Sequence, residues 1–152
     1  MNKDKPYTIE LENRDKYLYA LVGGEKLTPE IAKMYWDEIA EMCSKIQTSK
    51  IMIKKNFSKS VSPPEMLEMG VYLGKILTGK QIAFLDKYRN EDINELGKVI
   101  ARTQGVLMRI FSNKVYAEKW LVPVMHPVNQ AARLRVARCF SKCSFSNAFG
   151  VL

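Results

Sequence analysis

The sequence has little from which to build a disulfide framework or a metal centre. Its 152 residues include three cysteines and one histidine. An odd cysteine count without a stapling pattern is typical of a reducing compartment. Cys139, Cys143 and His126 lie near one another, but zinc needs about four ligands. We therefore expect no metal, no cofactor and no cysteine–histidine catalytic pair, and the residues predict that the protein is not an enzyme.

Long apolar runs are also missing. No run approaches the roughly 18 to 20 residues of a membrane span, and the first six residues lack the apolar stretch of a signal peptide. Gly23 and Gly24 have neither the further glycines nor the lysine of a phosphate-binding loop. With 47% apolar and 26% charged residues, the chain is typical of one folded domain. These features predict a cytoplasmic protein without a transmembrane segment.

Acidic residues are absent from the C-terminal part of the chain. The net charge is +8, yet no acid follows Glu118, and residues 122–152 contain Arg133, Arg135, Arg138 and Lys142. We expect a domain over residues 1–121 and a basic tail over residues 122–152 that is poorly ordered or forms a short helix. The tail has three interpretations: peripheral contact with an anionic membrane, docking on the body or a partner, or an extension without a selected function.

Hydrophobic periodicity in the body alternates between strand and helix patterns. Two alternating segments around Asn13–Asp15 predict a hairpin, and Gly23–Gly24 should end its second strand. Further strands are expected at 51–53, 81–85 and 106–111, and helices should begin at caps provided by Thr28, Ser62, Asp92 and Ser112. The predicted fold is a single small α/β domain, β-β-α-β-α-β-α-β-α, with a mixed, mostly parallel sheet packed by helices.

Two features mark the helix that follows Ser62. Glu65 stands three residues after Ser62, the spacing at which a glutamate reaches back to the cap's amide. Gly70 and Gly74 lie one turn apart, and because glycine weakens a helix, they suggest close approach of another backbone. That contact is either internal or part of a dimer, and the oligomeric state stays open.

The chain resembles a known family in several segments: the hairpin, the Thr28–Pro29 helix start, the segment 56–63, the strand 82–84, and the ending from Arg109 to Leu121. Over residues 6–121 it looks like the SpoIIAA-like, STAS-related family. The resemblance implies a bacterial, non-enzymatic regulatory module that binds another protein. The alternative it implies is a carrier or sensor of a small apolar, lipid-like ligand.

The resemblance also nominates a phosphorylation site. Related bacterial antagonists of anti-sigma factors are switched at a serine between the third strand and the next helix. The Asp-Ser-Ser-Gly-like motif of those proteins is absent here, so position alone nominates Ser60 or Ser62. A phosphate there would sit at a helix N-terminus, which favours anions. The simpler interpretation of Ser62 is an ordinary helix cap.

A lysine cluster surrounds the same segment. Lys54, Lys55 and Lys59 could attract an acidic partner or an anion, although a solvated strand end explains them as well. Without an aromatic platform, they do not indicate specific nucleic-acid binding. The apolar-ligand alternative depends on methionines expected on the first two helices, which either line a pocket or fill the core: Met34, Met42, Met66 and Met69.

Overall fold

Two antiparallel strands open the fold, and helices and strands then alternate. A computed structural model of the chain describes residues 5–123. Its elements are β1 (Thr8–Asn13), β2 (Leu18–Lys26), α1 (Pro29–Ile46), β3 (Lys50–Lys59), α2 (Pro63–Leu77), β4 (Gln81–Asp86), α3 (Glu91–Thr103), β5 (Leu107–Phe111) and α4 (Lys114–Leu121). The predicted order of elements is confirmed. The predicted tail, from residue 124 onward, lies outside the described residues.

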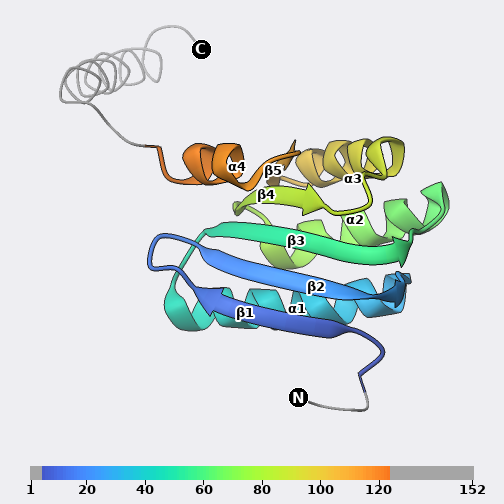
Figure 1. The fold of residues 1–152 in the computed structure, drawn as a ribbon, viewed down its shortest axis with the longest axis horizontal. Coiled ribbons are helices and arrows are strands. Elements are labelled where there is room, and N and C mark those ends of the chain that lie inside the picture. Colours follow the sequence, from blue (N-terminus) through green and yellow to red (C-terminus); the bar gives the residue numbers. More distant parts are fainter. Residues whose placement is uncertain (1–4, 124–152) are drawn as a thin grey trace, which may run out of the picture. The chain divides into compact units, whose positions relative to one another are not determined.

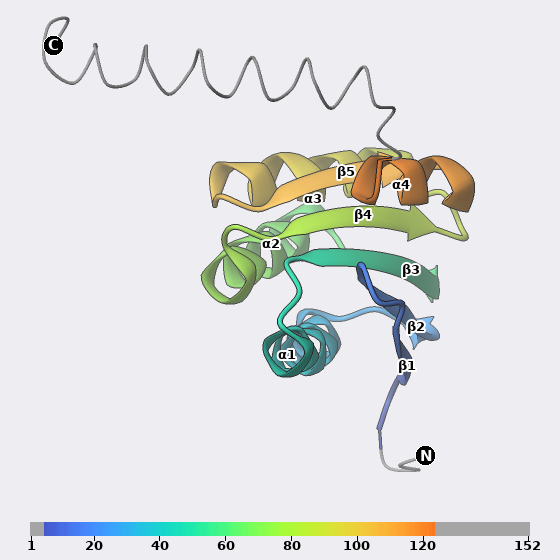
Figure 2. The same cartoon turned by 90° about the vertical axis from the view of Figure 1, so that its left-hand side faces the viewer.

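The five strands form one mixed sheet in the order β1-β2-β3-β4-β5 (Figure 1). β1 is antiparallel to β2, and the other neighbouring strands are parallel. Helices α1, α2 and α3 cover one face, and α4 lies on the opposite face (Figure 2). The parallel strands therefore end at a common edge, which we call the carboxyl edge.

Strand alternation divides the buried residues between the two faces. In β3, Ile51, Ile53 and Phe57 face α1–α3, whereas Met52 faces α4. The core under α1–α3 is the larger of the two, and all three helices contribute to it. The core under α4 is small and contains Tyr17, Met52, Ala83, Leu85, Ala117 and Leu121.

Two of the predicted helix caps are confirmed. The Thr28 hydroxyl accepts from the Ile31 amide, and Ser62 and Glu65 form the full capping box. The other two predicted caps are wrong. Asn113, not Ser112, caps α4 by accepting from the Val115 amide, and α3 begins after Asn90, two residues before the predicted Asp92.

The second and third strands are longer than predicted. β2 continues through Gly23 and Gly24 to Lys26, and β3 continues past the expected end at residue 53, through Asn56 and Phe57, to Lys59. These two extensions pair with each other, Gly23 with Asn56 and Gly24 with Phe57. A Cβ atom on Gly24 would lie 2.9 Å from the Phe57 ring, so glycine at this position allows the ring to pack against the strand. The glycine does not end the strand.

The glycines of α2 form an internal contact. A Cβ atom on Gly70 would overlap Ile100, and one on Gly74 would overlap Gln104, both in or at the end of α3. The expected close approach is therefore the packing of α2 against α3. Within residues 5–123, no helix is both long and apolar enough to cross a membrane.

Candidate functional site

The junction between β3 and α2 contains both serines nominated from the sequence. Ser62 is exposed, and its Oγ lies 2.8 Å from Glu65 Oε1, to which it donates, while accepting from the Glu65 amide. Ser60 is half-buried, and its hydroxyl oxygen is buried without a hydrogen-bond partner among the described residues. Ser62 thus already serves as a cap, and Ser60 has a hydroxyl that the local backbone does not use.

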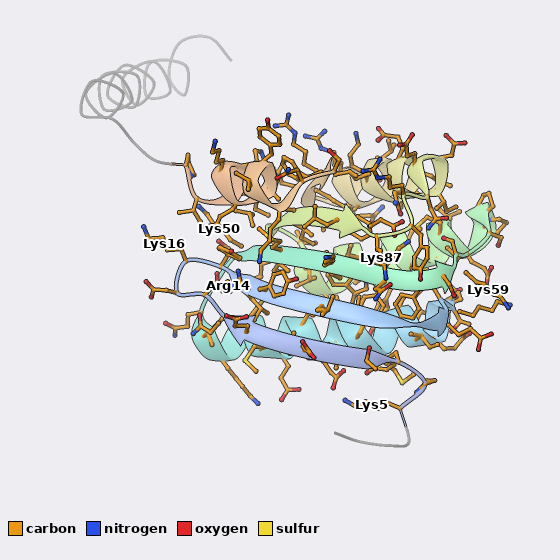
Figure 3. All side chains as sticks on the ribbon, viewed as in Figure 1. Lys5, Arg14, Lys16, Lys50, Lys59 and Lys87 are labelled. Carbon is orange, nitrogen blue, oxygen red and sulfur yellow. The ribbon has the colours of Figure 1, made fainter. Side chains whose placement is uncertain are left out.

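The three candidate lysines do not form one surface. Lys59 is exposed at the end of β3, with Nζ 3.5 Å from a Glu25 carboxylate oxygen. Lys54 is exposed on the α4 face of the sheet. Lys55 is 1% exposed, so the prediction that it belongs to an accessible lysine cluster is wrong. Successive strand residues point to opposite faces, and this alternation directs Lys55 into the layer under α1–α3. Figure 3 shows Lys59 and Lys87 toward the carboxyl edge and Lys50 and Lys16 at the other edge.

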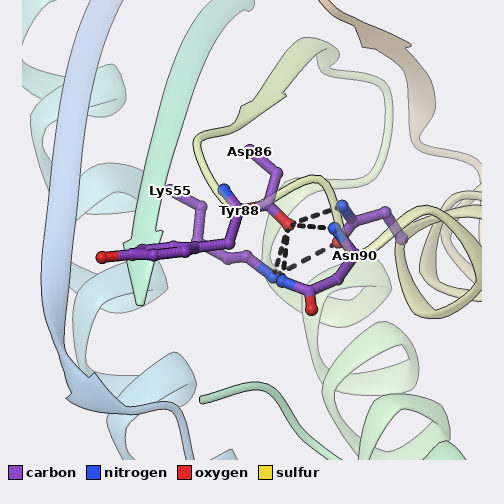
Figure 4. A network of polar contacts seen from close by, with 5 residues as sticks. Lys55, Asp86, Tyr88 and Asn90 are labelled. Atoms are coloured by element: carbon purple, nitrogen blue, oxygen red, sulfur yellow. Dashed lines mark hydrogen bonds and ion pairs between the residues drawn. The ribbon is translucent and has the colours of Figure 1, made fainter. Parts of the chain in front are cut away.

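Lys55 belongs to a buried polar network at the end of β4 (Figure 4). Its Nζ lies 3.4 Å from Asp86 Oδ2 and donates to Asn94 Oδ1 at 3.2 Å. Asp86 Oδ2 also accepts from the Asn94 side chain at 2.7 Å and from the backbone and side chain of Asn90. Its Oδ1 accepts from the Tyr88 amide at 3.1 Å. One carboxylate therefore shapes the loop that connects β4 to α3.

Burial and charge act in opposite directions on the two ionised groups. Burial lowers the pKa of Lys55, and the Asp86 carboxylate only partly opposes this. Burial alone would raise the pKa of Asp86. Hydrogen bonds from Asn94 and Asn90 and the positive charge of Lys55 outweigh it, and the pKa of Asp86 is lowered. The carboxylate is thus held ionised, as its role in the loop requires.

A cavity of about 40 Å³ lies beside this network, between the sheet and the helices. Met66, Met69 and Met108 line it, and Lys55 and Asn94 are polar residues of the lining. Of the four methionines considered from the sequence, Met66 and Met69 reach the cavity, whereas Met34 is 40% exposed. The space is large enough to hold water. A larger apolar ligand would have to displace side chains, and the flexible methionines permit such movement.

The connections from β4 and β5 lead to opposite faces of the sheet, β4 to α3 and β5 to α4. In open sheets with parallel strands, this divergence creates a crevice at the carboxyl edge, where ligands bind. A hollow of about 230 Å³ lies at that point, and we call it the basic crevice. Its lining comprises Lys54, Leu85, Asp86, Lys87, Arg89, Phe111, Ser112 and Lys114.

Sequence reasoning missed most of this edge. Asp86 and Asn94 were not considered, nor were Lys87, Arg89 and Lys114. A signal for the buried pair existed, because the apolar alternation Ile51, Ile53, Phe57 leaves Lys55 at a buried position. No comparable pattern brings Lys54 together with Arg89 and Lys114, since they come from three separate segments that meet through the fold.

Other reactive groups offer no alternative centre in the part of the chain that the structure describes. Burial raises the pKa of the Cys43 thiol, which disfavours the reactive thiolate. Within residues 5–123, no three histidine, cysteine or acidic side chains are grouped to hold a metal ion. Cys139, Cys143 and His126 lie outside the described residues.

Comparison with known proteins leaves the family unassigned. No family model matches the chain, and no curated protein matches it at a significant level. The fold and the carboxyl edge therefore carry the functional argument.

Proposed function

We propose that the chain is a non-enzymatic regulatory module of the SpoIIAA-like, STAS-related kind that binds another protein. The proposal rests on the order and arrangement of the elements: a hairpin is followed by alternating helices and strands, and the strands form a mixed sheet packed by helices. This is the architecture that the sequence resemblance implies. Fold analogy alone does not assign a function, so the proposal also requires a surface.

The surface that we propose comprises the end of β3 and the first two turns of α2. Lys59 and Ser62 are exposed there, and Leu67 on α2 is 53% exposed. A protruding apolar side chain beside polar groups is typical of the centre of a modest protein interface. The capping box fixes the start of α2, which reduces the ordering cost when a partner binds.

Site-specific photocrosslinking tests this surface. A photoreactive phenylalanine analogue replaces Leu67 in the full chain, expressed in its native host cells. The matched control carries the analogue at Val115, which is 58% exposed on α4 on the opposite face. We expect a defined protein adduct from position 67 and none from position 115. Equal adduct patterns at both positions, or no adduct at 67, would contradict the proposed surface.

Ser60 and Ser62 remain the candidate phospho-acceptors of this module. A phosphate on Ser62 would place a dianion beside the Glu65 carboxylate, which now lies 2.8 Å from Oγ. Like-charge repulsion would break the capping box and loosen the first turn of α2. Phosphorylation would then alter the proposed binding surface directly.

Asparagine separates the two roles of Ser62, because it caps helices well but accepts no phosphate. For Ser62→Asn, we expect an unchanged free energy of unfolding. We also expect that phosphatase treatment no longer changes the protein adduct formed through position 67. Ser60→Ala is the parallel variant for the other serine. If the adduct responds to phosphatase treatment equally in wild type and both variants, neither serine is the switch.

The methionine-lined cavity supports a second candidate, a carrier or sensor of a small apolar ligand. Met66 and Met69 are unbranched and flexible, and the glycines at 70 and 97 also line the cavity. Native mass spectrometry of the purified full chain, compared with its denatured mass, tests this function. A mass lost on denaturation, with an apolar molecule recovered by extraction, would support the carrier, and identical masses would count against it.

A further inference from the structure

The basic crevice gathers positive charge that the described structure does not neutralise. Lys54, Lys87, Arg89 and Lys114 line it, and among residues 5–123 none of these four forms an ion pair with a carboxylate. The amines of Lys87 and Lys114 lie over the rings of Tyr88 and Tyr19 instead. Like charges collected in a concave site raise the local potential and concentrate anions.

The one acid in the lining does not cancel this charge. Asp86 is 2% exposed at its side chain, and its carboxylate is engaged by Lys55, Asn90 and Asn94. Its negative charge is thus compensated within the buried network. The crevice therefore presents four cationic side chains to solvent, together with the exposed Ser112.

We infer that the basic crevice binds a small oligophosphate anion, such as pyrophosphate or an organic diphosphate. Lysine and arginine are the usual partners of phosphoryl oxygens, and arginine contacts two of them at once. Four cations match the charge of two linked phosphoryl groups better than that of a single carboxylate. Phe111, half-buried in the wall, offers an apolar surface to the organic part of an ester.

The neighbouring surface defines where the anion lies. A second hollow of about 400 Å³ adjoins the crevice and shares Asp86, Arg89, Phe111 and Ser112 with it. Its other lining residues include Glu91 and Glu95, whose carboxylates repel an anion. Phosphoryl groups are therefore directed to the side of Phe111 that Lys54, Lys87 and Lys114 line.

Calorimetric titration of the full chain with sodium pyrophosphate tests the inference. Chloride is the only other anion, and amide chemical shifts are followed in parallel. We expect saturable binding to one site, with shifts centred on residues 87–89 and 111–114. In Lys87→Gln/Arg89→Gln, affinity should fall by about tenfold or more, because charged hydrogen bonds are lost.

The matched control removes the same charge elsewhere. Lys16 and Lys75 are exposed and lie outside the crevice lining, so Lys16→Gln/Lys75→Gln should change affinity by about twofold or less at moderate salt. Binding that is not saturable, an equal loss in the control variant, or shifts centred on other residues would each overturn the inference. The altered positions differ from those of the crosslinking test, so each proposal can fail without the other.

Discussion

Lys55 lies in the interior as the partner of Asp86, whereas the sequence placed it in a lysine cluster that could attract an anion. We expect Lys55→Met to lower the free energy of unfolding by about 3 kcal/mol, because it leaves a buried carboxylate without its counter-charge. Asn90 and Asn94 still donate to Asp86, which keeps the loss at the lower end of such effects. Urea denaturation measures the change.

The adjacent residue provides the control for this variant. Lys54 precedes Lys55 in the same strand, is exposed and forms no ion pair within residues 5–123. Lys54→Met should therefore alter stability by no more than about 0.5 kcal/mol. If both variants lose the same stability, the buried pair is not what Lys55 contributes.

Asp86 should make the free energy of unfolding depend on pH in the acidic range. The pKa of its carboxyl is lowered in the folded chain, so below its ordinary value of about 4 the unfolded chain binds more protons. The free energy of unfolding should then decrease as the pH falls below about 4 toward the folded pKa. Asp86→Asn removes this contribution, so the stability gap between wild type and variant should narrow as the pH falls. Denaturation at several pH values measures the gap, and a constant gap would contradict this assignment.

The sequence pattern is sufficient to predict that Lys55 is buried, but it does not identify the partner of Lys55. Alternation along residues 51–57 places Lys55 on the apolar side of the strand. Its charge suggested exposure, because lysine is almost never fully buried without a partner. That partner, Asp86, lies across the sheet on β4, and one sequence does not reveal the pairing of these strands.

At the scale of the elements, the contact between α2 and α3 can be tested at Gly70. Helix propensity alone predicts that Gly70→Ala stabilises the protein by about 1 kcal/mol. The added Cβ would overlap Ile100, so we expect a net loss of about 1 to 3 kcal/mol. Thermal or urea denaturation provides the value. Lys75→Ala, at an exposed position of the same helix, should be neutral within about 0.5 kcal/mol. A stabilised Gly70→Ala would show that α3 does not pack closely there.

The errors in element length share one physical cause. Glycine pairs and a polar, serine-containing segment both suggest turns when each is judged alone. Gly23 and Gly24 lie opposite Asn56 and Phe57, and each segment gives the other a strand partner. Local signals located the helix starts at Thr28 and Ser62, because a cap involves residues only three positions apart. Strand ends depend on distant neighbours.

For the whole molecule, the α/β class and the order of elements followed from hydrophobic periodicity together with turn and cap signals, whereas the basic crevice did not. The basic crevice exists because α3 and α4 leave adjacent strands toward opposite faces. The side on which the last helix packs determines whether Lys54, Arg89 and Lys114 meet. Trp120 and Leu121 pack against the sheet and hold α4 on this face, and no motif around the lysines does so.

The unequal cores predict that α4 detaches before the rest of the domain unfolds. The core under α4 contains six buried residues, far fewer than the core under α1–α3. Native-state hydrogen exchange should therefore give α4 amides a lower opening free energy than those of β3 and β4. Leu121→Ala should reduce that opening free energy by about 2 kcal/mol or more, whereas Val115→Ala, at an exposed position of α4, should leave it unchanged. Exchange of α4 only through global unfolding would contradict this prediction. Because Lys114 belongs to both α4 and the basic crevice, a bound oligophosphate should slow α4 exchange.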